Sequence, residues 1–287
     1  MKIEFYIAGA LEPNSDGKVS KARNLIEKET KDTLEYLGHE ITILDKIIFA
    51  EKQKYGEAIK SIDKNEGFTD NGNATGFGKT IKLGQKSSIV YREEILNGII
   101  NYKDKTDLSI GEEIAFYFFR HEIGHAIDNK LRDPVNIKSE LNFDVRKISN
   151  YYIEIFISEF AANWNSSIRT SKAFYDDLSS TKETNINNHY SEIKTIKGLE
   201  EYSLSQRQYG VADRLWLILM ELSQLLAISI KLSYKFKFDS SMINLDFQMK
   251  LVNICQELGL KYPVIDEELS ERIYRIWDEL YKKEYEI

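Results

Sequence analysis

The sequence predicts an α+β fold, in which a small N-terminal sheet is followed by a mostly helical remainder. Up to about residue 108, short apolar stretches with the length of strands alternate with helical segments. From Ser109 onward, almost every segment has apolar residues at the spacing of one helix face. The composition, with 42% hydrophobic and 30% charged residues, is typical of a folded globular chain and not of a disordered one.

The N-terminal part supplies the strands. Strands are predicted at residues 1–8, 40–49, 79–83 and 87–91, and helices at residues 19–37 and 51–62. The last two strands flank Gly84, as in a hairpin, and residues 65–78 form a loop rich in turn residues. Glu4 interrupts the apolar stretch at the N-terminus, so that stretch is a better first strand than a secretory signal.

The remainder is predicted to be helical. Helices are expected at residues 109–131, 151–164, 171–178, 211–232, 241–258 and 266–283, with a polar loop at residues 179–189. The most apolar segment, residues 215–230, is interrupted by Glu221 and Gln224 and is shorter than a membrane span. This segment is therefore expected to be a buried helix, and no membrane span is predicted.

The charge of the chain bears on its partners, and its cysteine content bears on its compartment. The chain carries a net charge of −7, and its acidic and basic residues are interleaved without a basic stripe, so no nucleic-acid partner is expected. The single cysteine, Cys255, cannot form an internal disulfide and lies among helix-forming residues as part of a core. This cysteine usage is consistent with a reducing compartment but does not require one.

One motif carries the functional prediction: the segment His121-Glu122-Ile123-Gly124-His125 has the pattern HExxH. On a helix, residues i and i+4 lie on one face, so His121 and His125 can direct their imidazoles at one metal ion. Glu122 lies beside that ion, where it can take a proton from metal-bound water. The motif predicts a catalytic zinc site with one Zn²⁺ per chain.

The residues around the motif favour the helix that it requires. Ser109 and Glu112 have the spacing of a capping box, which begins a helix. The helix is expected to end near Leu131, because Pro134 disfavours a helical conformation in the residue before it. The apolar run at residues 114–119 indicates that the helix is buried, as a rigid metal site requires.

A catalytic zinc ion takes a third protein ligand and leaves one position for water. At the spacing used by metzincins the third histidine would be at position 131, which is Leu131, and His39 and His189 lie in no supporting pattern. Glu159 is the stronger candidate, because it places a single charge on the otherwise apolar surface of a predicted helix, where a carboxylate requires a partner. Glu154 lies on a different face of that helix and competes less well.

Tyr152 lies two helical turns before Glu159 on the same face, so its phenol can donate to the oxyanion of a tetrahedral intermediate. The adjacent Tyr151 is an alternative for this role. The HExxH motif, this tyrosine and the string Glu159-Phe160-Ala161-Ala162 resemble the lethal-factor-like bacterial metallopeptidases, which include the Pro-Pro endopeptidases. The string from Glu159 to Asn163 also resembles the ImmA/IrrE-type peptidases, which cleave phage and stress repressors.

The first resemblance implies a gluzincin with a zincin-like fold. In such an enzyme His121, His125 and Glu159 would bind zinc, Glu122 would be the general base, and Tyr152 would assist. The zincin-like catalytic domain is then expected over residues 1–200, mixed α/β to about residue 108 and with the metal-binding helices at residues 109–170. A helical region over residues 201–287 either belongs to this domain or forms its own.

The predicted function is that of a zinc metalloendopeptidase acting on a peptide or protein substrate. Two alternatives remain open: a non-catalytic binding protein that keeps the zincin fold, and an intracellular protease that cleaves repressors. Because no signal peptide is seen, the chain is expected in the cytoplasm, or to be exported by a route that the sequence does not show. A toxin that acts inside another cell is equally compatible with these features.

Overall fold

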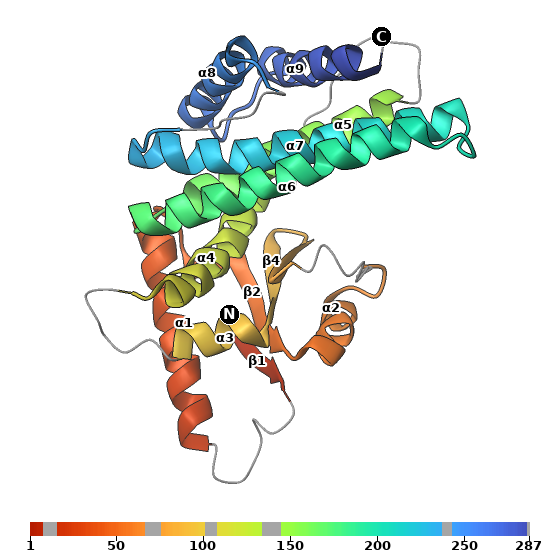
Figure 1. The fold of residues 1–287 in the computed structure, drawn as a ribbon. Helices are drawn as coiled ribbons and strands as arrows, with labels where there is room; N and C mark the ends of the chain where they lie inside the picture. Colours follow the sequence, from red (N-terminus) through yellow and green to blue (C-terminus); the bar gives the residue numbers. More distant parts are fainter. Residues whose placement is uncertain (8–15, 67–75, 101–107, 134–144, 237–242, 286–287) are drawn as a thin grey trace. The chain divides into compact units, whose positions relative to one another are not determined.

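The computed structural model describes residues 1–7, 16–66, 76–100, 108–133, 145–236 and 243–285 (Figure 1). Within these residues the protein is mostly helical and has one four-stranded sheet near its N-terminus, which confirms the α+β class. The chain divides into two compact units: the first comprises Met1–Leu131 and Ile168–Thr170, and the second comprises Arg132–Ser167 and Ser171–Ile287. The division falls after Leu131 and not near residue 200, because helices on both sides of residue 200 share one core.

The sheet of the first unit has three parallel strands and one antiparallel edge strand, in the order β1-β2-β4-β3. The parallel strands are β1 (Lys2–Tyr6), β2 (Leu44–Ala50) and β4 (Lys86–Arg92), and the edge strand is β3 (Gly78–Leu83). β3 and β4 form the predicted hairpin, in which Gly84 has a φ of +60°, a conformation that glycine adopts without strain. The strand predicted at residues 40–49 is shorter than expected, because a 3-10 turn at Ile41–Ile43 precedes β2.

Helices cover both faces of this sheet. They are α1 (Asp16–Tyr36), α2 (Tyr55–Ile62), α3 (Glu93–Ile100) and α4 (Ile110–Leu131). Successive residues of a strand point to opposite faces. Ile47 and Phe49 of β2 accordingly share a core with α1, α3 and α4, whereas Ile48 and Ala50 share one with α2. The sequence did not predict α3, and residues 67–75 of the predicted loop lie outside the described residues.

α4 carries the HExxH motif and has the bounds that the sequence predicts. The backbone N–H of Ser109 donates to Oε2 of Glu112 (2.8 Å), and the backbone N–H of Glu112 donates to Oγ of Ser109 (3.4 Å). The predicted capping box is therefore present. The helix ends at Leu131, and Pro134 lies outside the described residues. Most side chains of α4 are buried, as a rigid site on this helix requires.

The described part of the second unit is helical and is built around α7. Its helices are α5 (Val145–Ser166), α6 (Lys172–Gly198), α7 (Leu204–Leu232), α8 (Leu245–Lys261) and α9 (Glu267–Tyr285) (Figure 1). α7 contacts each of the other four helices and supplies much of the core. By length and composition α7 would also pass as a membrane span, but 61% of its most apolar window is buried inside the structure. A core helix passes the same test, so this is weak evidence for a span.

The polar loop predicted at residues 179–189 is wrong, because α6 runs through it without a break. No glycine or proline interrupts this stretch, and most of its serines, threonines and asparagines are exposed to solvent: Ser180, Thr181, Thr184, Asn187 and Asn188. Leu178, Ile186, Tyr190 and Ile193 are buried at helical spacing and hold α6 on the core. The helices predicted at the C-terminus correspond to α7, α8 and α9, with residues 241 and 242 outside the described residues.

Candidate metal centre

His121 and His125 lie one turn apart on α4 and face the same side. Their Nε2 atoms are 3.1 Å apart, and their rings are perpendicular, at 89°, with centroids 4.7 Å apart. Two ligands at 2.0–2.1 Å from a tetrahedral zinc ion lie about 3.3 Å from each other. The two histidines therefore have nearly the separation of two ligands of one ion. His121 is buried and His125 is half-buried, so one side of the pair is accessible.

Glu122 is buried, and two residues of the edge strand β3 hold its side chain. The hydroxyl of Thr80 donates to Glu122 at two acceptors. Its Oγ1 lies 2.8 Å from Oε2 of Glu122 and 2.9 Å from the backbone oxygen of the same residue. A Cβ atom placed on Gly78 would lie 2.4 Å from Cγ of Glu122, closer than real contacts allow. The absence of a side chain at Gly78 thus creates the space that the carboxylate-bearing side chain occupies.

The phenols of Tyr55 and Tyr91 lie within the electrostatic influence of Glu122. Burial raises the pKa of both phenols well above the usual range, and the negative charge of Glu122 raises it further. Oη of Tyr91 donates to the backbone oxygen of Phe119, at 2.6 Å, and Oη of Tyr55 donates to that of Val90, at 3.3 Å. Tyr91 therefore ties the sheet to α4 two residues before the motif.

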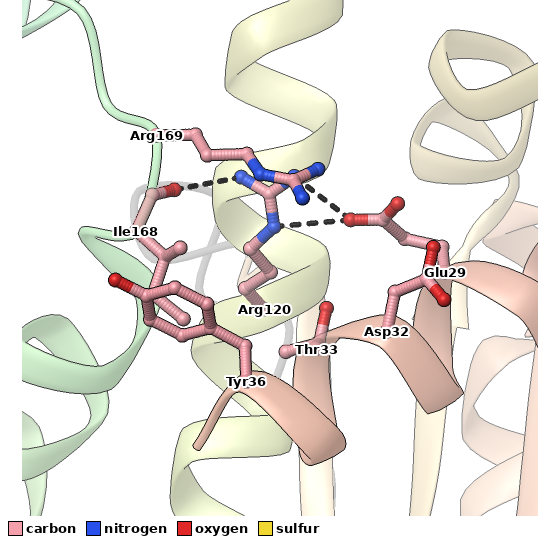
Figure 2. A pocket seen from close by; sticks show the side chains of 7 residues that line it. All are labelled: Glu29, Asp32, Thr33, Tyr36, Arg120, Ile168 and Arg169. Carbon is pink, nitrogen blue, oxygen red and sulfur yellow. Dashed lines mark hydrogen bonds and ion pairs between the residues drawn. The ribbon is translucent and has the colours of Figure 1, made fainter.

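Arg120, which precedes His121, anchors α4 within the first unit (Figure 2). Its Nη2 and Nε atoms donate to Oε1 of Glu29 at 2.8 and 3.1 Å, and its Nη1 donates to the backbone oxygen of Ile168 at 3.0 Å. Its guanidinium group also lies 5.4 Å from the centre of the Phe116 ring. The pocket beside these residues has a volume of about 10 Å³, which is room for about one water molecule. Arg120 is therefore a structural anchor of α4, and the pocket beside it is too small to be a ligand site.

Glu159 lies on α5 in the second unit, within the helix that the sequence predicts. Its carboxylate accepts a hydrogen bond at Oε2 from Nε2 of Gln224, at 2.9 Å. Glu154 is engaged elsewhere, because Arg132 binds both of its oxygens, at 2.5 and 2.8 Å. The Glu154 carboxylate is thus held by an ion pair within the second unit.

Tyr152 is buried in the second unit, whereas Tyr151 is 64% exposed. The ring of Tyr152 stacks on Trp216, with centroids 5.4 Å apart and an interplanar angle of 13°. Its hydroxyl donates to Oδ1 of Asp213. Burial, followed by the hydrogen bond to Asp213, raises the pKa of this phenol well above its usual range. Tyr152 therefore stays protonated and can act as a donor.

The three predicted ligands fit a zinc ion by their chemistry. His121 and His125 each offer an imidazole nitrogen and Glu159 offers a carboxylate oxygen, all of which zinc accepts. Among the described residues, His39 and His189 belong to no group of this kind, and burial lowers the pKa of both.

Three residues that contact the predicted site were not recognised from the sequence: Gly78, Thr80 and Gln224. One feature of the sequence pointed to Gln224, because it interrupts the apolar segment of α7. Only a turn-like string pointed to Gly78, and no feature pointed to Thr80. Comparison of the chain with protein-family models, with curated proteins and with solved structures finds no match in any of the three.

Proposed function

We propose that this chain is a zinc-dependent metalloendopeptidase of the gluzincin type, with a zincin-like fold. The observation that carries the proposal is the pair of histidines on α4, whose Nε2 atoms lie 3.1 Å apart. Two ring nitrogens at this distance can share one proton or bind one cation, but they cannot both be protonated without repulsion. The motif also supplies Glu122, which could act as a base beside a bound cation. A cation shared by the two histidines therefore gives all three side chains a role.

His121, His125 and Glu159 are the proposed ligands. Two histidines and one glutamate form a donor set that catalytic zinc sites use, with the fourth position left for water or substrate. When bound, zinc would polarise the scissile carbonyl and lower the pKa of the attacking water. The edge strand β3 beside Glu122 supports the zincin-like assignment, because in zincin-like peptidases a sheet edge beside the metal helix pairs with the extended substrate.

The roles of the other residues follow from their contacts. Glu122 would take a proton from the attacking water and deliver it to the leaving amine. Thr80 would keep the carboxylate of Glu122 in one orientation through its 2.8 Å hydrogen bond. Tyr152 would donate to the developing oxyanion, for which its hydroxyl must exchange its present bond to Asp213.

The first test is the metal content of the purified chain, measured by mass spectrometry. We expect about one zinc per chain in the wild type and none in His125→Ala, which lacks one proposed ligand. His189→Ala is the matched control, because His189 lies on α6 outside the proposed ligand set and its loss should leave the zinc in place. A wild-type chain that takes up no zinc from solution would refute the proposal.

The second test separates catalysis from metal binding. Glu122→Gln keeps the shape of the side chain but removes the proton acceptor, so we expect cleavage of a peptide library to fall by about 100-fold or more, with zinc retained. Equal cleavage by this variant and the wild type would exclude Glu122 as the base. Zinc binding without cleavage by either protein would favour the non-catalytic binding protein instead.

A further inference from the structure

Two polar residues, Glu221 and Gln224, interrupt the apolar middle of α7, and the structure shows what they contact. Nε2 of Gln224 donates to Oε2 of Glu159 on α5, at 2.9 Å. Lys182 on α6 donates to Oε1 of the same amide. Its ammonium group also pairs with Oε2 of Glu221, at 2.5 Å. Glu221, Lys182 and Gln224 therefore form one network that reaches the carboxylate of Glu159.

The order of donors and acceptors in this network fixes the orientation of the Gln224 amide. An ammonium group can only donate, so Lys182 selects the carbonyl oxygen of the amide. The NH₂ group is then directed at Glu159, whose ionised carboxylate can only accept. The reverse orientation would place two donors together at Lys182 and two acceptors together at Glu159. Lys182 thus determines which group Gln224 presents to Glu159.

Asn185 stabilises the end of the network that lies away from Glu159, and the network is largely buried. Nδ2 of Asn185 donates to Oε1 of Glu221, at 3.1 Å, which fixes the carboxylate that pairs with Lys182. The side chains of Lys182 and Glu221 are each only 16% exposed. Hydrogen bonds to charged groups are strong in such surroundings, so the chain of contacts can define a single position for the Glu159 carboxylate.

We infer that Gln224 and Lys182 are positioning residues that orient Glu159 as a metal ligand. This inference rests on the proposed function, in which Glu159 is the third ligand. Gln224 engages Oε2 and so restricts the rotation of the carboxylate, which lowers the cost of ordering it when a metal ion binds. The inference also accounts for two polar residues in the middle of a core helix, where leucine or isoleucine would otherwise fit.

The test is the zinc dissociation constant, measured by competition with a chromophoric chelator. Gln224→Met keeps the length of the side chain but removes the donor, and we expect zinc to bind about 10–100-fold more weakly. Gln208→Met is the matched control, because it makes the same substitution at another half-buried glutamine of α7. We expect it to leave the zinc dissociation constant unchanged. Lys182→Met should also weaken binding, and Lys182→Arg, which keeps a donor for the amide, should restore it.

The absorption spectrum of the cobalt-substituted chain gives a second readout, because it reports the geometry of the ligands. We expect the spectrum of Gln224→Met to differ from that of the wild type. Wild-type affinity and spectrum in both Gln224→Met and Lys182→Met would overturn the inference while leaving the zinc site intact. A wild-type chain that binds neither zinc nor cobalt would instead refute the proposed function.

Discussion

Gly78 and Thr80 show how closely the edge strand is fitted to Glu122. Gly78→Ala would place a methyl group 2.4 Å from Cγ of Glu122, so the glutamate side chain or the strand must move. Displacing a catalytic group by about 1 Å can reduce the rate by about 100-fold. We therefore expect Gly78→Ala to lower peptide cleavage by about that factor while the zinc content stays unchanged.

The controls for this prediction come from the same unit. Gly56→Ala lies on α2 with nothing within 4 Å of the added methyl group, so it should cleave at the wild-type rate. Thr80→Val removes the hydroxyl that binds Glu122 and should lower the rate, whereas Thr80→Ser keeps the hydroxyl and should not. Full activity in Gly78→Ala would show that the position of Glu122 does not limit the reaction.

At the scale of helices, Arg120 joins α4 to α1 through its ion pair with Glu29. The side chains are only 7% and 14% exposed, so Arg120→Met leaves a mostly buried carboxylate without its charged partner. We expect the free energy of unfolding to fall by about 3 kcal/mol, measured by urea denaturation. Arg275→Met on α9 is the control: its arginine is 74% exposed, and its loss should change stability by less than about 0.5 kcal/mol.

The helices also show what a single sequence can predict. The capping box and the HExxH motif predicted α4, and apolar residues at helical spacing predicted α5. The prediction failed at residues 179–189, where many polar residues were interpreted as a loop although Ile186 and Tyr190 keep the helical stripe. The proposal of Glu159 as a ligand rests on a pattern of the same local kind, a single charge in an apolar helical segment.

The partners of the site residues could not be predicted in the same way. Thr80 and Glu122 are 42 positions apart, and Gln224 and Glu159 are 65 positions apart. No local pattern connects residues across such distances, because the pairing depends on how the strands and helices pack. The sequence thus indicated the candidate site residues, whereas their hydrogen-bond partners became visible only in the fold.

For the whole molecule, the proposed site links metal binding to folding. The proposed ligands come from two different helices, α4 and α5, so no short segment of an unfolded chain would offer all three, and zinc should bind the folded state far better than the unfolded one. A free zinc concentration 100 times the dissociation constant would stabilise the fold by about 2.7 kcal/mol. For a chain of this size, that corresponds to a rise in unfolding temperature of about 4–5 °C.

Scanning calorimetry with and without zinc measures the rise in unfolding temperature that the metal causes. This rise tests whether Glu159 contributes to the linkage between metal binding and folding. Glu159→Gln should lose most of the rise, because an amide is a much weaker zinc ligand than a carboxylate. Glu154→Gln makes the same substitution on the same helix, but at a carboxylate that pairs with Arg132. This variant should unfold at a lower temperature without metal, because the ion pair between Glu154 and Arg132 is lost, yet keep the full zinc-induced rise. An equal rise in Glu159→Gln and the wild type would mean that another residue is the third ligand.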